Sequence, residues 1–360
     1  MKKNLYKWAL PALLLMQACS KDDAPVAPVT PAAKGLYVLS EGGIGKDNTK
    51  LGFYNLTTNN FTGDYFVQQN PGETIFGDTG NDGIIYGGKL YIVLNFTSQV
   101  VVLNANNGTL LKRIPFLTPT ASKKEPRYAV AARGKVYVTS YDNTVSIIDT
   151  SSLNISGSIA VGKTPEGIAV FGNYLYVANS GSRDYPNFDS TVSVLDMNTG
   201  VEIKKITVGY NPNKVEVATN GDVYVSAYGD YNKRTASISV INSSTNLLKA
   251  TLDTAKYQYS HVKIFGNTAY FFNNYGGVGV SKVYNTDTNT DIRAEFITDG
   301  TAITTPYGIN IDEQNGDVYI MDAKDYTTAG AVTCFDKAGK KKFAFSVTPG
   351  VSPNKVLFNR

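Results

Sequence analysis

The sequence predicts an all-β protein, a seven-bladed β-propeller whose first blade is closed by the C-terminal strand. A strand-like segment with a central tyrosine occurs seven times, and a second strand ending in Asn or Asp follows each one. Four short strands in a repeat of about 47 residues are typical of propeller blades. No helical periodicity follows residue 35, which argues against helical repeats. The repeated tyrosines are Tyr37, Tyr91, Tyr137, Tyr176, Tyr224, Tyr270 and Tyr319.

Each repeat also contains an outer strand, such as "KKITVG", and an inner strand, such as "GINIDE". The N-terminal repeat, from Gly35 to about Gln69, has three strands and lacks the inner one. The segment "SPNKVLFN" at 352–359 matches "NPNKVEVAT" at 211–219, which lies at an inner-strand position. We therefore expect residues 352–359 to complete the first blade and leave no sheet edge open.

Turn residues follow the Asn or Asp that ends each second strand, because an Asx side chain can bond its own backbone and set a turn. One such segment, "DTNTD" at 287–291, has the alternate spacing of calcium ligands. It lacks the following Gly and the closing Glu of an EF-hand loop, so we predict a turn. No HExxH motif or Cys/His cluster occurs, so zinc is not expected. We predict no metal site and no cofactor.

The first 18 residues predict an export signal. Lys2, Lys3 and Lys7 form its positive start, and the apolar run at 8–16 is too short to cross a bilayer as a helix. The stretch "LLLMQAC" resembles the end of a lipoprotein signal, which implies cleavage before Cys19 and lipidation of that residue. A plain secretory signal is the alternative.

Residues 19–34 form a proline-rich tether, and the propeller is expected to span residues 35–360. The "SKDD" after Cys19 resembles the acidic surface-export tag of Bacteroidota lipoproteins, which implies a lipid anchor in the outer membrane and a position facing the cell exterior. Loss of the signal removes three lysines and no acids, so the formal net charge falls from +4 to +1, which argues against a nucleic-acid partner. Cys334 is the only other cysteine, so no internal disulfide is expected.

Connector lengths predict which face of the ring is functional. Strand direction alternates within a blade. The connector between the strand with the repeated tyrosine and the strand that ends in Asn or Asp therefore lies on the same edge as the link to the next blade. We call this edge the working rim. Its connectors range from the short "SYDNT" (140–144) to the long "NSGSRDYPNFDS" (179–190), whereas the turns on the opposite rim are short in every blade.

The working rim also concentrates tyrosines beside Asn, Ser and Gly, a composition that recognition surfaces use. Polar residues at the starts of the inner strands add hydrogen-bonding groups around the central channel. The alternative is that the aromatic residues cap blade edges and the polar ones are merely solvated. The predicted ligand-binding residues are Arg127, Tyr128, Glu166, Arg183, Tyr185, Phe188, Lys214, Tyr228, Tyr231, His261, Tyr275, Tyr307, Tyr326 and Lys355.

The repeats resemble the YVTN-type, or YncE-like, propeller family. Residues 164–212 carry its unit almost whole, as "TPEGIAV", "LYVAN", "VSVLD" and "ITVGYNP". Together with the signal, "CSKDD" and the tyrosine-rich rim, they resemble the cell-surface cobalamin-capture lipoproteins of Bacteroidota. That resemblance implies binding of a corrinoid and its transfer to a TonB-dependent outer-membrane transporter. No cobalamin motif is readable in the residues themselves.

Two other function classes are compatible with the sequence. A Ser-His-Asp arrangement could use only His261, and a lone histidine in a β-protein is more often structural. A propeller hydrolase or lyase, lactonase-like and using Glu166 and His261 as acid and base, is one alternative. A glycan- or protein-binding surface adhesin is another. We expect a non-catalytic binding protein for a small molecule.

Overall fold

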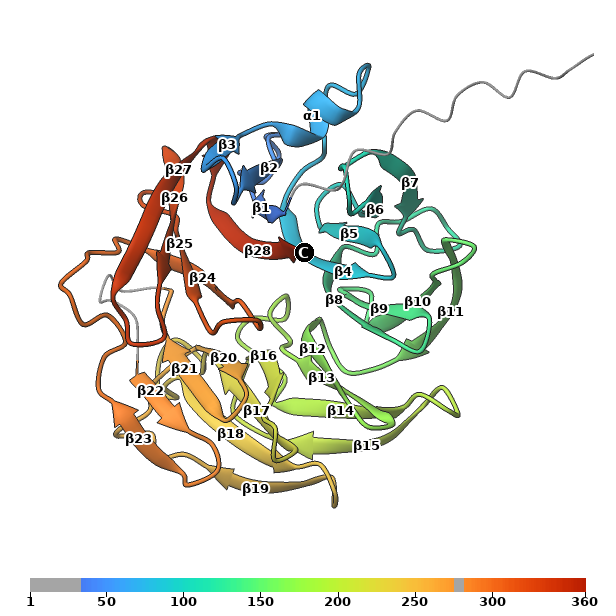
Figure 1. Ribbon diagram of the computed structural model, residues 1–360. Helices are drawn as coiled ribbons and strands as arrows, with labels where there is room; N and C mark the ends of the chain where they lie inside the picture. Colours follow the sequence, from blue (N-terminus) through green and yellow to red (C-terminus); the bar gives the residue numbers. More distant parts are fainter. Residues whose placement is uncertain (1–33, 275–281) are drawn as a thin grey trace, which may run out of the picture. The chain divides into compact units, whose positions relative to one another are not determined.

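A computed structural model of the chain describes residues 34–274 and 282–360. These residues form seven four-stranded antiparallel sheets arranged in a ring (Figure 1), as the repeats predict. The predicted signal peptide (1–18), Cys19 and nearly all of the tether lie outside the described residues. So does Tyr275, one of the predicted ligand-binding residues. Within the described ranges, no helix is long and apolar enough to span a membrane.

In each blade the strands run from the inner to the outer edge in chain order, apart from the closing strand of the first blade. Blade 1 consists of β28 (Pro353–Asn359), β1 (Gly35–Ser40), β2 (Lys50–Asn55) and β3 (Asn60–Thr62), and blade 2 of β4 (Gly80–Tyr86), β5 (Lys89–Leu94), β6 (Gln99–Asn104) and β7 (Leu110–Pro115). Blade 3 consists of β8 (Pro126–Ala132), β9 (Lys135–Ser140), β10 (Thr144–Asp149) and β11 (Asn154–Ala160). Blade 4 consists of β12 (Pro165–Phe171), β13 (Tyr174–Asn179), β14 (Thr191–Asp196) and β15 (Val201–Thr207).

Blades 5 to 7 repeat the same arrangement. Blade 5 consists of β16 (Pro212–Val217), β17 (Asp222–Ala227), β18 (Ser237–Asn242) and β19 (Leu247–Thr251). Blade 6 consists of β20 (His261–Phe265), β21 (Thr268–Phe272), β22 (Lys282–Asn285) and β23 (Thr290–Arg293). Blade 7 consists of β24 (Pro306–Ile311), β25 (Val318–Asp322), β26 (Ala329–Phe335) and β27 (Lys341–Val351).

The last strand closes the ring as predicted. β28 pairs antiparallel with β1, with Val38 opposite Val356 and Leu36 opposite Phe358. The chain reaches β28 directly from the outer strand β27 of the seventh blade, so the two ends of the propeller share one sheet. This pairing hydrogen-bonds the inner edge of β1, which would otherwise be an open edge.

The repeated tyrosines explain why the blades pack as a ring. Each one lies in a cluster of buried hydrophobic residues that also contains residues of the next blade. Tyr37, for example, packs with Leu90 of blade 2, and Tyr319 of blade 7 packs with Leu36 of blade 1. Alternation along the strand then places the intervening side chains on the other face of the sheet. The core is therefore seven interfaces between neighbouring blades.

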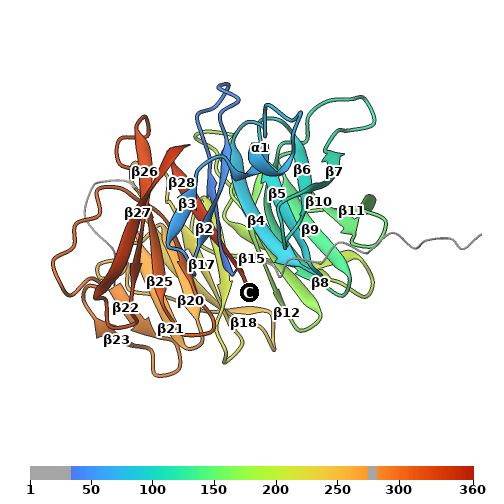
Figure 2. The same cartoon turned by 45° about the horizontal axis from the view of Figure 1, so that its top comes forward.

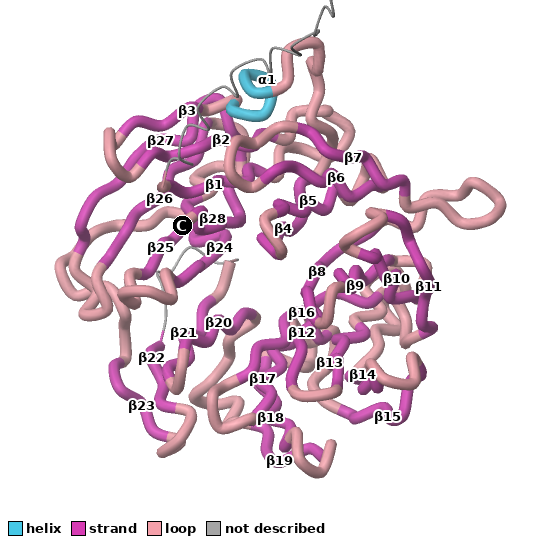
Figure 3. The backbone as a smooth tube through the Cα atoms, turned by 45° about the vertical axis from the view of Figure 1, so that its right-hand side comes forward, coloured by secondary structure: helices cyan, strands magenta, loops and turns pink. Residues whose placement is uncertain are grey.

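One element was not predicted from the sequence. The helix α1 (Tyr65–Gln69) follows β3 and is drawn in cyan in Figure 3. Its Phe66 is buried and packs on Phe76, with ring centroids 4.5 Å apart. Five residues are too few to show helical periodicity, which needs a window of about 11 to 18 residues.

The two rims differ as the connector lengths indicate. Short turns join β12 to β13 and β14 to β15, whereas residues 180–190 join β13 to β14 on the working rim. Figure 2 shows the long connector between β1 and β2, in blue, projecting from the ring. The segment "DTNTD" forms a turn and the start of β23, so the expectation of a turn is confirmed.

Candidate ligand-binding site at the working rim

A cavity of about 640 Å³ lies where the inner strands of all seven blades converge. This volume falls within the range of small-molecule sites, roughly 300 to 1,000 Å³. Every inner strand contributes to its lining, and most of the contributed groups are polar at the working rim. In blade order, these strands place Lys355, Asp82, Arg127, Gly167, Lys214, His261 and Tyr307 around the cavity.

A repeated irregularity of the backbone lies beside most of these residues. In six of the seven described blades, the pairing of the inner strand with its neighbour shifts within the first few residues. In blade 5, Pro212 pairs with Ala227 and Lys214 with Ser226, so Asn213 is an extra residue. Such bulges redirect side chains and are frequent beside functional sites. Blade 6, where His261 pairs directly with Phe272, lacks the shift.

The chain also turns sharply just before these strands. Five inner strands follow a non-glycine residue with positive φ, and Asn211 (φ 57°) is one of them. A proline begins five of the inner strands, and its missing N–H suits a position where ladder pairing has not yet begun. The polar residues at the cavity mouth therefore lie at or directly beside the point where the ladder is interrupted.

Arg127 and Glu166 form an ion pair across the interface of blades 3 and 4. The Arg127 Nε donates to Glu166 Oε2 at 2.8 Å, and the Tyr141 hydroxyl donates to Glu166 Oε1. The Arg127 guanidinium carbon lies 4.9 Å from the Tyr141 ring centroid. Glu166 is buried behind Arg127 and does not line the cavity, so its role is to position Arg127.

Lys214 reaches across the cavity mouth to Tyr128. Its Nζ donates to the Tyr128 hydroxyl and lies 3.9 Å from the centroid of that ring. Burial lowers the pKa of Lys214 to about 8, with the positive charges of Lys355 and Arg127 adding to the effect and Asp82 opposing it. Burial also raises the pKa of the Tyr128 phenol, so this hydroxyl stays protonated at neutral pH.

Lys355 and Asp82 form a second pair, between β28 and β4. The Lys355 Nζ lies 2.7 Å from Asp82 Oδ1, and Asp82 Oδ2 accepts from the backbone N–H of Ala129 at 3.0 Å. Burial alone would lower the pKa of Lys355, but attraction to Asp82 outweighs it and the pKa is raised. Lys355 therefore remains charged through the physiological range.

Glu41 is a cavity residue that the sequence analysis missed. It follows β1 directly, and its Oε2 accepts a hydrogen bond from the Tyr307 hydroxyl. Burial raises the pKa of Glu41, and only part of that effect is offset by the Tyr307 hydrogen bond and by Arg127 and Lys214. The position of Glu41 in its repeat could have identified it. Tyr141 and Tyr228 also come directly after the tyrosine-bearing strand of their blades, so an alignment of the repeats places Glu41 beside the mouth.

His261 is buried and lies against Tyr228. Its Nε2 is 3.3 Å from the Tyr228 hydroxyl, and its Nδ1 is 3.0 Å from Ser260 Oγ. Burial, with the positive charge of Lys214 as a second cause, lowers the pKa of His261 well below its usual value. The imidazole is therefore neutral at pH 7 and presents one donor and one acceptor.

The aromatic residues of the long connector lie outside the cavity lining. Within this connector Tyr185 is 71% exposed and Phe188 only 8% exposed, and Tyr231 of the blade 5 connector is 64% exposed. The Phe188 ring packs edge-on against both, with centroids 5.7 Å from each. Phe188, one of the predicted ligand-binding residues, therefore offers little open aromatic area, and its ring supports its two neighbours.

The remaining rim residues also stand above the cavity. Arg183 contacts Glu125 and lies 4.8 Å from the Tyr141 ring centroid. Tyr326 packs edge-on against Tyr307. Of the predicted residues, the structure brings seven together in the cavity lining, namely Arg127, Tyr128, Lys214, Tyr228, His261, Tyr307 and Lys355.

No group of three or more His, Cys, Asp or Glu side chains in the described ranges is arranged to hold a metal ion. Cys334 is buried between blades, and burial raises the pKa of its thiol to about 12. A thiol with that pKa is a poor nucleophile at neutral pH.

The fold and this cavity define a seven-bladed β-propeller with a polar cavity mouth on its working rim. Residues 34–352 match the family described as a domain of unknown function (DUF5074), and the chain belongs to that family. No curated protein matches the sequence.

Two solved structures share the fold. One is a quinoprotein alcohol dehydrogenase-like protein from Bacteroides thetaiotaomicron, with a TM-score of 0.64 and 15% identity over 92% of this chain and 80% of that one. The other is the hydrazine synthase of Kuenenia stuttgartiensis, with a TM-score of 0.57 and 17% identity over 74% of this chain and 80% of that one. At these identities the likeness concerns the fold alone, since one propeller fold hosts many activities.

Proposed function

We propose that this protein is a non-catalytic capture protein that binds a small molecule at the working rim. The observation that carries the proposal is the convergence of polar and aromatic side chains from six of the seven inner strands on one cavity of about 640 Å³. Ligand sites combine apolar area with a few fixed polar groups in this way. The exposed rings of Tyr185 and Tyr231 extend the surface outward.

A corrinoid is the ligand that fits this surface best. It is a broad, partly apolar macrocycle fringed by amides, which suits a cavity mouth that combines aromatic rings with polar groups. The corrin face would rest on the rim tyrosines, and its amides would meet polar groups such as Arg127 and Tyr307. The neutral His261 is not needed as a ligand to cobalt, because ring and amide contacts suffice.

The cellular role follows from the sequence resemblances. A lipid on Cys19 would anchor the chain in the outer membrane, and the tether would hold the propeller outside the cell. Captured corrinoid would then pass to a TonB-dependent transporter in the same membrane. Support for this step comes only from the resemblance to cobalamin-capture lipoproteins.

Isothermal titration of the mature chain (residues 20–360) with cyanocobalamin tests the proposal. We expect binding at micromolar concentrations or tighter, and no heat of binding would overturn it. Tyr128→Phe should weaken binding because it removes the hydroxyl that accepts from Lys214. Tyr86→Phe is the matched control, since Tyr86 lies at the far end of β4, where its hydroxyl accepts from the backbone N–H of Gly134.

A further inference from the structure

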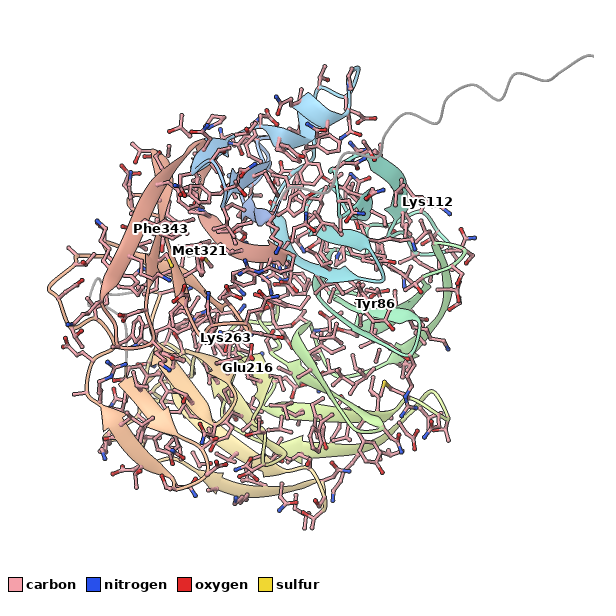
Figure 4. All side chains as sticks on the ribbon, viewed as in Figure 1. Tyr86, Lys112, Glu216, Lys263, Met321 and Phe343 are labelled. Atoms are coloured by element: carbon pink, nitrogen blue, oxygen red, sulfur yellow. The ribbon has the colours of Figure 1, made fainter. Side chains whose placement is uncertain are left out.

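Four cationic side chains line the cavity, and three of them have carboxylate partners. Arg127 pairs with Glu166, Lys355 pairs with Asp82, and the Lys263 Nζ lies 2.9 Å from Glu216 Oε1. Lys263 and Glu216 lie near the axis of the ring (Figure 4), one strand pleat below His261 and Lys214. Within residues 34–274 and 282–360, Lys214 has no carboxylate within 4.0 Å.

The direct contacts of Lys214 leave its charge uncompensated. Its hydrogen-bond partner, the Tyr128 phenol, is neutral. A cation held in a partly buried site without a counter-ion is costly, and such a site attracts an anion. The titratable and charged groups that face Lys214 from the surrounding elements are Glu41, Asp82, Arg127, Glu166, His261 and Lys355.

Arg127 provides a second cation on the same tyrosine. Its guanidinium carbon lies 5.7 Å from the Tyr128 ring centroid, and Lys214 Nζ lies 3.9 Å from that centroid. The pair with Glu166 uses Nε, and in the described part of the chain neither Nη atom makes a hydrogen bond. A planar guanidinium beside an ammonium is a common arrangement for phosphate and carboxylate recognition.

We propose that Arg127 and Lys214 form an oxyanion subsite that binds a phosphodiester or carboxylate group of the captured ligand. This inference rests on the proposed capture function and specifies the ligand further. In a complete corrinoid the matching group is the phosphodiester that joins the macrocycle to its nucleotide, since the other side chains of the ring are neutral amides. Glu41 is a nearby carboxylate, and its negative charge would oppose the binding of an anion.

The first experiment compares two corrinoids by isothermal titration of the mature chain. Cyanocobalamin carries the phosphodiester, and dicyanocobinamide lacks the whole nucleotide. We expect cyanocobalamin to bind at least tenfold tighter, and Lys214→Met to remove most of that difference while leaving dicyanocobinamide affinity nearly unchanged. Equal affinities for the two corrinoids, unaffected by Lys214→Met, would overturn the subsite and leave corrinoid capture intact.

The second experiment uses dimethyl phosphate, a phosphodiester without a corrin ring, followed by ³¹P NMR line broadening. Broadening in the wild-type chain that Lys214→Met abolishes supports the subsite even if neither corrinoid binds, and no broadening in the wild type overturns it. Lys205→Met is the charge-matched control. Lys205 lies on the outer strand β15, pairs with Glu202 and should leave the broadening unchanged.

Discussion

Replacing Tyr176 with Phe tests whether the repeated tyrosines stabilise the ring through hydrogen bonds to the next blade. The Tyr176 hydroxyl donates to Asn246 Oδ1 in blade 5, and both residues are buried. Phe keeps the ring in its cluster with Val223 and Ile241, so the apolar packing stays the same. The substitution leaves Asn246 Oδ1 buried without its donor, which costs about 1 to 3 kcal/mol.

Tyr91→Phe is the matched control, because Tyr91 holds the same repeat position in blade 2. Its hydroxyl is buried and has no hydrogen-bond partner among the described residues. Removing it should change the free energy of unfolding by less than about 0.5 kcal/mol, or stabilise the fold. Urea denaturation followed by far-UV circular dichroism measures both variants, with the midpoints compared at equal m values. Equal losses in the two variants would refute the reasoning.

Three further predictions concern the loop, the closing strand and pH. Shortening residues 180–190 to the three-residue connector of blade 3 should preserve folding and weaken ligand binding in isothermal titration. The reason is that the shortened chain lacks Tyr185 and the Phe188 ring that supports Tyr231. Unchanged affinity would show that the loop does not take part in binding. Deleting residues 353–359 exposes the edge of β1 and should abolish cooperative unfolding, so a cooperative monomer by circular dichroism and gel filtration would contradict the closure argument. Dimethyl phosphate binding should weaken up to about tenfold between pH 7 and 9, because burial lowers the pKa of Lys214 to about 8 and only its charged form attracts the anion. Affinities that agree in ³¹P titrations at pH 7 and 9 would contradict this.

The fold could be predicted because its core repeats with the sequence. Every blade must place one large side chain into the next blade, and the repeated tyrosine does this in each described interface. The closing strand was readable because residues 352–359 copy another inner strand. The helix α1 could not be predicted, because it is held by a single buried residue, Phe66, and shows no hydrophobic periodicity.

The site was only partly predictable, for a physical reason. Polar residues at the starts of the inner strands could be identified, since a propeller brings those positions to one axis. Which carboxylate pairs with which cation depends on contacts between blades, such as Arg127 with Glu166 and Lys355 with Asp82, and sequence spacing does not determine them. The burial of Phe188 depends on the conformation of a connector that has no counterpart of equal length in the other blades.

The shifted starts of the inner strands separate binding from folding in this propeller. Below the shift, each inner strand is paired with its neighbour, and its apolar side chains pack within or between blades. Above it, residues such as Asn213 and Tyr307 are extra to the ladder, so their side chains can change without breaking a strand pair. A family built in this way can alter the groups at the cavity mouth blade by blade while every interface between blades is retained. Ligand specificity should therefore depend on the residues at and directly beside these shifts, and stability on the repeated tyrosines.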